Sequence, residues 1–426
     1  MRLHFPVLIS LVLAGGCRDA GARTAFSDPE TVSAATTVGA APMFALSPRG
    51  ARAVAWVSAP DGGTDGRLYV STGGAPSELR DSLGPIEPHG EAPPKLSYGP
   101  DGTLYALYAV GKVVPGRRFP MSSLRLAKSA DDGKTWSAPA TIASDSAFGT
   151  RNFHALHVGG DGALYVGWLE ANHGKSTTFV TRSTDQGATW TTPVAADANQ
   201  SCPCCRTAIA TSRDGTLFLA WRTVLPGNVR DVVVARSSDH GATWAPPVRV
   251  HADNWVFDGC PHAGPSMQVD SAGTVHIAWW TGKQGAAGTF YARSTDNGTT
   301  FGTPIPLGVG EFSAPAHVQL ALGPAQTVVA VWDDGTVRTP KVVMRVSHDN
   351  GTSFSPPTLV SSEGRAATFP VLALRDRDLT IAWSEQSEAE HDHEKDMAPN
   401  MKDPTAVKGL SRVGQSAVRV RNGRLQ

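Results

Sequence analysis

Short apolar runs alternate with turn residues along most of this 426-residue chain. In three segments a glycine turn is followed by an apolar run that ends in tryptophan: Asp161-Gly-Ala-Leu-Tyr-Val-Gly-Trp168, Asp214-Gly-Thr-Leu-Phe-Leu-Ala-Trp221 and Ala272-Gly-Thr-Val-His-Ile-Ala-Trp279. Looser versions end at Trp56, Tyr108, Trp332 and Trp383. Apolar runs of this length between turn signals predict β-strands. The same strand therefore recurs seven times, and the pattern predicts an all-β protein.

A second motif, eight residues long, occurs five times between these runs. Its copies are Ser129–Trp136, Ser183–Trp190, Ser237–Trp244, Ser294–Phe301 and Ser347–Phe354, with starts 54, 54, 57 and 53 residues apart. Each copy carries one aspartate at its third position: Asp131, Asp185, Asp239, Asp296 and Asp349. Aspartate accepts backbone hydrogen bonds across a tight turn, and the glycine two residues later tolerates a positive φ. A period of this size predicts a radial array of similar units.

These five motifs resemble the Asp box, or BNR repeat, of sialidase-like β-propellers, and the resemblance extends from about residue 43 to about residue 386. It implies a single all-β propeller of four-stranded antiparallel blades. The seven recurring strands favour seven blades, and six, the number usual in sialidases, is the alternative. The last unit lacks a fourth strand, and an N-terminal strand in the segment from Thr31 to Val38 would supply it and close the ring. Because Asp boxes lie in hairpins away from the family's catalytic centre, they are structural residues.

The composition excludes one class of partner. Lysine and arginine number 38, aspartate and glutamate also 38, and the formal net charge is zero. A chain with this balance offers no electrostatic argument for binding nucleic acid.

The N-terminus predicts export. Residues 1–17 combine a basic start, an apolar stretch and small residues before Cys17, which is typical of a secretory signal. Leu13-Ala-Gly-Gly-Cys17 resembles a bacterial lipobox, which implies cleavage before Cys17 and lipid attachment to its thiol. An ordinary cleaved signal is the alternative. Because residue 18 is arginine, and not the aspartate that often retains lipoproteins at the inner membrane, the outer membrane is favoured. Residues 18–30 are then a flexible tether, and residues 31–426 form the propeller.

The repeat also predicts which residues face the propeller axis. The box hairpin lies on one face, and the crossover from one blade into the inner strand of the next lies on the opposite face, beside the axis. Counting seventeen residues back from the strand-ending tryptophans of three adjacent blades leads to this crossover at Arg151, Cys204 and His262. Since the positions are equivalent in neighbouring blades, we expect their side chains to converge.

Four cysteines and a histidine fall in two adjacent crossovers: Cys202, Cys204, Cys205, Cys260 and His262. An even number of cysteines in an oxidising compartment is consistent with two disulfides, most easily Cys202–Cys205 and Cys204–Cys260, because a bridge between the neighbours Cys204 and Cys205 is strained. Thiolate and imidazole together instead suit a soft metal, copper or zinc. The spacing matches no standard zinc-finger pattern, so disulfides and a metal site both remain open.

A charged stretch at residues 388–410 interrupts the last unit. It contains His391, His393, Met397 and Met401 within eleven residues. It is interpreted either as a solvated loop or as a second set of soft ligands, and in the second case the methionines favour copper.

The family resemblance also implies a catalytic centre of three arginines, a Tyr–Glu nucleophile pair and an aspartate acid/base. Arg151 and Arg206 lie at inner-strand entrances, where they suit an anionic ligand, and we expect His154 and Glu170 to face the same pocket. Neither a third arginine nor a Tyr–Glu pair in the family's order is recognisable in the sequence.

Three functions are therefore weighed. The leading hypothesis is an outer-membrane lipoprotein that binds a ligand, copper or another soft metal, at a Cys/His-lined axial face without sialidase activity. The second is a divergent sialidase or other glycoside hydrolase. The third is a non-catalytic envelope scaffold whose cysteines staple loops. The expected partners are the membrane, through the lipid anchor, and a glycan or an envelope protein.

Overall fold

The computed structural model describes residues 24–33, 38–59, 66–87, 90–116, 121–142, 148–172, 175–387 and 416–426. Every regular element in these residues is a β-strand, and none of them forms a helix that could span a membrane. Cys17 and the stretch 388–410 lie outside the described residues.

Seven antiparallel sheets follow one another along the chain, and in the first six each strand pairs with the next one in sequence. The first blade contains β3 (Val38–Leu46), β4 (Arg52–Ala59), β5 (Arg67–Ser71) and β6 (Ser77–Leu79). The second blade contains β7 (Lys95–Tyr98), β8 (Leu104–Lys112), β9 (Met121–Ser129) and β10 (Ala140–Thr141). The third blade contains β11 (Arg151–Val158), β12 (Leu164–Asn172), β13 (Lys175–Ser183) and β14 (Val194–Ala195). The fourth blade contains β15 (Ala208–Thr211), β16 (Leu217–Arg222), β17 (Val232–Ser237) and β18 (Val248–Arg249). The fifth blade contains β19 (Ser266–Val269), β20 (Val275–Thr281), β21 (Ala287–Ser294) and β22 (Ile305–Gly310). The sixth blade contains β23 (Val318–Leu322), β24 (Val328–Asp334), β25 (Lys341–Ser347) and β26 (Thr358–Leu359).

The seventh blade joins the two ends of the chain. It contains β27 (Arg365–Arg375), β28 (Asp378–Ser387) and β29 (Ala417–Arg424), and its outer strand consists of two short pieces, β1 (Ala25–Phe26) and β2 (Glu30–Thr31), both paired with β29. The predicted seven-bladed propeller, closed by an N-terminal strand, is thus confirmed. The closing strand begins earlier in the chain than the predicted segment from Thr31 to Val38. β1 and Glu30 lie in the stretch expected to be a tether, and only Thr31 of β2 falls within the predicted segment.

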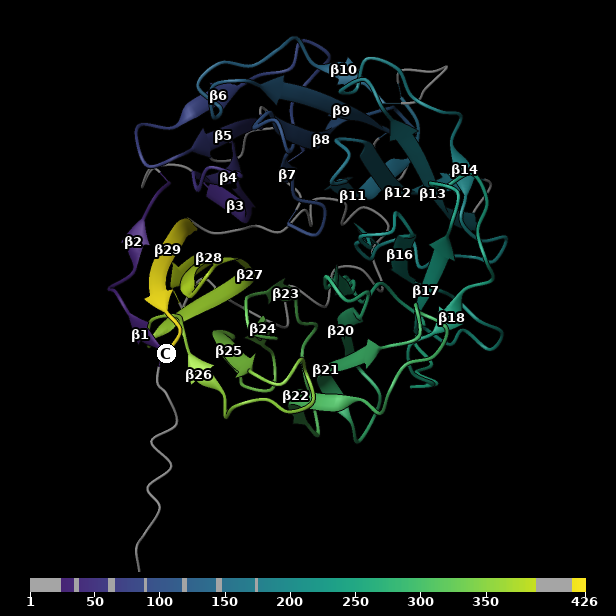
Figure 1. Cartoon of the computed structure of the whole chain (residues 1–426), viewed down its shortest axis with the longest axis vertical. Coiled ribbons are helices and arrows are strands. Elements are labelled where there is room, and N and C mark those ends of the chain that lie inside the picture. The colour runs from purple at the N-terminus through teal and green to yellow at the C-terminus, as the bar shows by residue number, and fades with distance from the viewer. Residues whose placement is uncertain are drawn as a thin grey trace, which may run out of the picture.

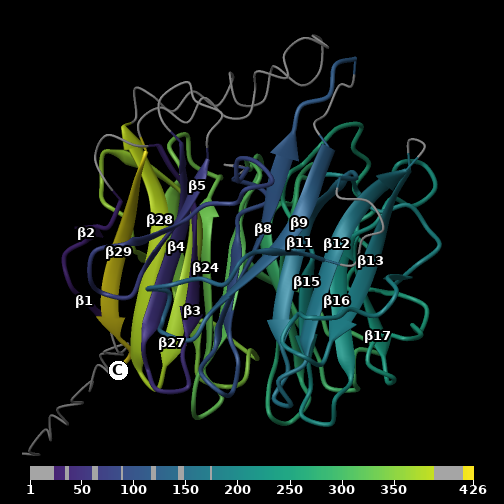
Figure 2. The same cartoon turned by 90° about the horizontal axis from the view of Figure 1, so that it is seen from above.

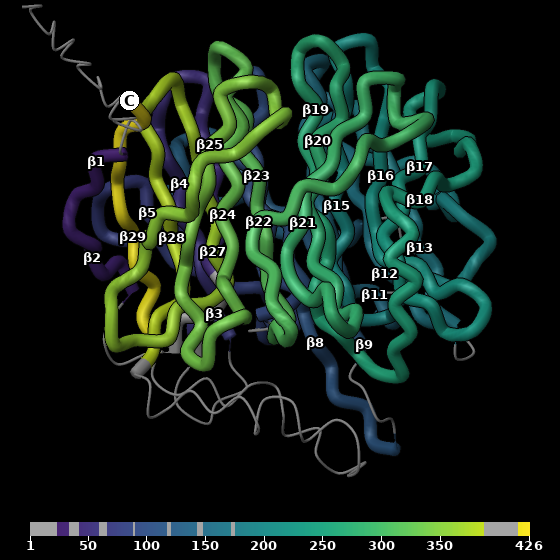
Figure 3. Tube along the Cα trace, turned by 90° about the horizontal axis from the view of Figure 1, so that it is seen from below, coloured from purple at the N-terminus to yellow at the C-terminus, as the bar shows by residue number. Residues whose placement is uncertain are grey.

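The blades form a ring in which the first strand of each blade is innermost. Figure 1 views this ring down its axis, with β3, β7, β23 and β27 near the centre and β6, β10, β14 and β22 at the rim. Figures 2 and 3 show the ring from its two sides, with the strands running between its two faces.

The recurring strand-ending aromatics form the core between blades. Each is at most 2% exposed: Trp56, Tyr108, Trp168, Trp221, Trp279, Trp332 and Trp383. Every one of them lies in the second strand of its blade, so that the sequence period places one large ring at the same depth in each sheet. Large aromatic rings bury much apolar surface, and their repetition explains why the seven sheets pack in one register.

Each Asp box forms the hairpin between the third and fourth strands of its blade. In the first copy Asp131 Oδ1 accepts hydrogen bonds from Ser129 Oγ (2.7 Å) and Thr135 N (2.9 Å), and Ser129 Oγ accepts one from Gly133 N (2.8 Å). The other four copies repeat all three bonds. Each box glycine has a positive φ, as predicted, between 74° and 90°.

The box hairpins also contact the preceding blade. In the fifth copy the backbone of Gly351 lies against the phenol of Tyr291 on β21, whose Oη bonds His276 Nδ1 (2.6 Å). Asn350 Nδ2 donates to Asp270 Oδ2 on the same preceding blade (3.1 Å). The boxes therefore join neighbouring blades on one face of the ring, and the opposite face is left for the crossovers.

Candidate functional site

The three positions found by counting along the repeat lie at the same face. Arg151 is the first residue of β11, and Cys204 and His262 lie in the crossovers that lead into β15 and β19. The Sγ atoms of Cys204 and Cys260 and a ring nitrogen of His262 all lie within 4.8 Å of one another. The two cysteine-bearing crossovers therefore converge, as expected.

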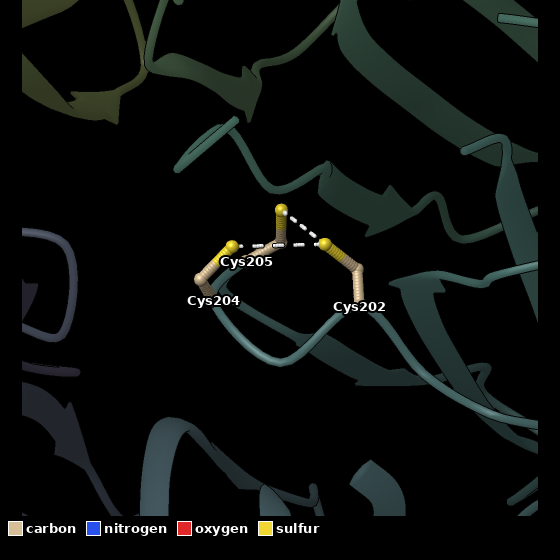
Figure 4. Close-up of side chains that lie close together, drawn as sticks. All are labelled: Cys202, Cys204 and Cys205. Atoms are coloured by element: carbon tan, nitrogen blue, oxygen red, sulfur yellow. Dashed lines mark hydrogen bonds between the residues drawn. The ribbon is translucent and has the colours of Figure 1, made fainter. Parts of the chain in front are cut away.

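A compact turn holds three sulfur atoms together before β15. Cys202, Cys204 and Cys205 are all buried, with Sγ–Sγ separations of 3.7 Å for Cys202–Cys204 and 3.5 Å for Cys202–Cys205. Figure 4 shows the three thiols pointing toward a common centre. The Cys202 amide donates to the carbonyl of Arg222 (2.8 Å), which fixes the turn to β16. All four described cysteines are free thiols.

Close backbone contact holds the second crossover against this turn. At Gly264 an added Cβ would lie 2.3 Å from the Arg206 carbonyl oxygen, so only glycine fits there without movement. The buried Arg222 guanidinium donates through Nη2 to the carbonyls of Ala263 (3.0 Å) and Trp280 (2.5 Å). His262 itself has a φ of 54°, an unusual conformation that is often found at functional sites.

Two arginines create a positive environment for the buried sulfurs. Arg230 Nη1 donates to Cys202 Sγ (3.2 Å), and the Arg222 guanidinium also acts on this thiol. Hydrogen bonds from Cys204 and Cys205 lower the pKa of Cys202, although burial opposes this, and the arginines add to the effect. A thiolate is the form of cysteine that binds metals. The surroundings of Cys202 therefore favour its thiolate form.

Cys260 and His262 form a second reactive pair at the exposed edge. Hydrogen bonding from Cys204, followed by that from His262, lowers the pKa of the Cys260 thiol to about 5. For His262, burial favours the neutral ring, but the Cys260 hydrogen bond and the Glu91 carboxylate raise its pKa overall. Both pKa shifts favour the pair of thiolate and imidazolium over the neutral pair, and a metal bound at His262 would displace the imidazolium proton.

A charged cluster continues the site across the ring axis. His317, just before β23, bonds Asp333 Oδ2 through Nδ1 (2.7 Å) and Glu91 Oε2 through Nε2 (3.0 Å). Burial disfavours the charged ring, but Asp333 and Glu91 raise the pKa of His317 to about 9. Burial likewise opposes ionisation of Glu91, yet His317 lowers its pKa to about 2. The second and sixth blades are therefore linked by an ion pair.

This ion pair makes stability depend on pH. Because the pKa of His317 rises from 6.5 to about 9 on folding, the folded state keeps a proton that the unfolded chain has lost. We expect the metal-free protein to be stabilised fully below pH 6.5 and to lose this stability as the pH rises to about 9. Between pH 6.5 and about pH 9 the urea midpoint should fall further in the wild type than in His317→Gln. Parallel slopes in the two proteins would contradict the assignment.

Three of the residues expected to bind an anion, Arg151, Glu170 and Arg206, are engaged with other protein groups. Arg151 Nε donates to Glu170 Oε2 (3.2 Å), directly opposite in the β11–β12 register. Arg206 donates to the carbonyls of Gly90 (2.6 Å) and Glu91 (3.1 Å). His154 is fully buried, and burial, followed by repulsion from Lys95, lowers its pKa to about 3. The hydrogen bonds of Arg206 therefore support a crossover and those of Arg151 the β11–β12 pair, whereas His154 is buried.

The structure places further charged residues around the candidate site that were not expected from the sequence: Glu91, Lys95, Arg222, Arg230, His317 and Asp333. One of them had a recognisable signal, because counting seventeen residues back from Tyr108 leads to Glu91. Lys95 starts β7, and burial and the nearby Arg206 lower its pKa well below its usual range. Arg222 and Arg230 had no such signal, since Arg222 acts through contacts with the next crossover and Arg230 through its contact with Cys202.

Comparison with known proteins identifies the family. The sequence model of the BNR repeat-like domain matches residues 86–256 and 174–381. These matches cover more than half of the chain, which therefore belongs to this family, and the resemblance to sialidase-like Asp-box propellers is confirmed. No curated protein matches the chain.

Solved structures share the fold at low sequence identity. A Dyadobacter fermentans protein of unknown function is 15% identical, with 95% of this chain and 99% of that chain covered and a TM-score of 0.52. A PL25 polysaccharide lyase, an ulvan lyase, is 13% identical over 85% of this chain and 93% of its own, with a TM-score of 0.54. An α-L-arabinofuranosidase from Fusarium graminearum is 13% identical over 77% and 91%, with a TM-score of 0.50. Such distant likeness shows the fold alone.

Proposed function

We propose that this protein is an exported bacterial lipoprotein that binds copper in its cuprous state at the Cys/His side of the axial face. One observation carries the proposal: the ligand atoms of Cys204, Cys260 and His262 lie within 4.8 Å of one another, although they come from two crossovers. Thiolate and imidazole ligands select soft ions, and Cu(I) is the softest of the common candidates. Zinc, which prefers four ligands in structural sites, is the less suited alternative.

The tyrosines support a role other than sialidase catalysis. Tyr69 bonds Glu78 (3.2 Å), but this pair lies in β5 and β6, the outer strands of the first blade. Tyr108 bonds Asp81, and Tyr165 bonds His240 near an Asp box. A Tyr–Glu nucleophile would have to lie at the axial face beside a cluster of arginines, so these positions favour ligand binding over glycoside cleavage.

His262 separates the metal proposal from a purely structural one. Disulfides between Cys202 and Cys205 and between Cys204 and Cys260 would also bring the sulfurs together, but they have no need of an imidazole. We expect His262→Ala to lower the copper bound per chain in reduced protein while the metal-free melting temperature stays close to that of the wild type. The matched control is His348→Ala, an exposed histidine in the fifth Asp box.

The readout is copper content after loading with Cu(I) and gel filtration without oxygen. His348→Ala should retain the wild-type content. If His262→Ala retains it too, the imidazole is not a ligand. If neither variant nor the wild type binds copper when fully reduced, the scaffold with stapled loops becomes the better account.

The lipid anchor is a separate part of the proposal and rests on the lipobox-like segment that ends at Cys17. We expect Cys17→Ser to release the protein from the membrane fraction, because the thiol that would carry the lipid is lost. Fractionation of cells that express the two forms measures this directly. Membrane association that persists in Cys17→Ser would contradict the anchor and leave the copper site untouched.

A further inference from the structure

Cys204 belongs to two ligand groups at once. The first consists of Cys202, Cys204 and Cys205, and the second of Cys204, Cys260 and His262. Within each group all ligand atoms lie within 4.8 Å of one another. The two groups together offer five ligand atoms. One three-coordinate ion binds only three ligands, so a single ion would leave two of the five unused.

The first group has the geometry of an all-sulfur site. A metal–thiolate bond is about 2.3 Å long, so three sulfurs placed evenly around one ion lie about 4 Å apart. The two sulfur separations measured here, 3.7 Å and 3.5 Å, are slightly smaller than this value. All three cysteines are buried, so solvent has little access to this group. Three sulfur ligands suit Cu(I) better than an ion that needs four ligands.

The second group lies nearer the surface. Cys260 is exposed and His262 is partly exposed, whereas Cys204 is 5% exposed. An ion arriving from solvent would therefore meet Cys260 and His262 first. Because Cys204 is common to both groups, an ion could pass inward by exchanging ligands around this one sulfur.

We propose that the cluster holds two Cu(I) ions bridged by the Cys204 thiolate, with an inner site of three sulfurs and an outer site of Cys204, Cys260 and His262. This inference rests on the proposed function and adds its stoichiometry and path of entry. Four thiolates (−4) with two Cu(I) ions (+2) leave a charge of −2. The adjacent Arg222 and Arg230 guanidinium groups supply +2, so the loaded cluster is neutral.

The test is a titration of the reduced full-length chain with Cu(I), in competition with a coloured Cu(I) chelator and without oxygen. The wild type should bind two ions per chain. Cys205→Ser should bind only the outer ion tightly, and His262→Ala only the inner one. Cys204→Ser should bind neither ion tightly, because it loses the ligand that both sites share. His348→Ala should bind two ions like the wild type. Circular dichroism of each metal-free variant confirms that it is folded.

X-ray absorption of the wild type keeps the proposal testable even if a cysteine variant fails to fold. A copper–copper distance should appear only when the second equivalent has been added. Binding of one ion, or two ions without a copper–copper distance, would overturn the bridged pair and leave the proposed copper function intact. Binding of no ion by the reduced wild type would overturn both.

Discussion

Replacing Gly351 with alanine should destabilise the protein by about 2–5 kcal/mol. Gly351 has a φ of 77°, and a left-handed conformation costs a residue with a side chain about 1–2 kcal/mol. The added Cβ would also collide with the buried phenol of Tyr291 on the preceding blade, and overpacking of this kind costs about 1–3 kcal/mol more. Tyr291 has little freedom to move, because its ring packs edge-on against Phe354 and its hydroxyl bonds His276.

Gly364→Ala is the matched control for this substitution. Gly364 has a φ of 68°, but an added Cβ would meet nothing within 4 Å. It should therefore lose only about 1–2 kcal/mol, the conformational part of the effect. Urea unfolding of both variants measures the difference. Equal losses in the two would show that the box does not join the fifth and sixth blades, and copper binding should persist in whatever Gly351→Ala protein is folded.

Gly264→Ala should instead act on copper binding and weaken it by about tenfold or more. Substitutions that disturb the groups supporting metal ligands commonly have effects of this size. All five proposed ligands remain in this variant. The new Cβ would lie 2.3 Å from the Arg206 carbonyl oxygen and 2.7 Å from the Arg206 amide nitrogen, so the two crossovers must move apart. Cys260 and His262 would then move away from Cys204.

Gly160→Ala provides the matched control, since nothing lies within 4 Å of a Cβ at this turn. Its Cu(I) affinity should equal that of the wild type in the same chelator competition. Wild-type affinity in Gly264→Ala would mean that the sulfur and imidazole atoms can bind copper without the observed contact between the crossovers. The geometry described for the site would then be irrelevant to its function.

The sequence predicted the ring because its period is carried by local chemistry. The Asp-box turn depends on residues within one hairpin, and the strand-ending tryptophans mark the second strand of each blade. The closing strand was misplaced because β1 and β2 are each two residues long and carry no apolar alternation. Their pairing depends on β29, almost four hundred residues later, so no local pattern could locate them.

The site was predicted only where the period is regular. Counting along the repeat located Cys204 and His262, and the structure brings their side chains together. It did not locate His317, which lies two residues from the position that the same count gives from Trp332.

The positions of the arginines depend on contacts between distant segments. Arg206 was expected to meet an anionic ligand, and its guanidinium donates to the backbone of residues 90 and 91. Arg222 ends a strand and gives no sign in the sequence that it holds the next crossover in place. Such roles follow from the packing of one crossover on another, which a single sequence does not reveal.

The most direct test of the copper site is protection of its thiols. The reduced, folded protein is exposed to iodoacetamide with and without Cu(I), and the labelled cysteines are identified by mass spectrometry. We expect Cys260, the exposed thiol with the lowered pKa, to react readily in the metal-free protein. Once copper is bound, Cys260 should be protected, together with Cys202, Cys204 and Cys205. Labelling of Cys260 at the same rate with and without Cu(I) would contradict the central claim.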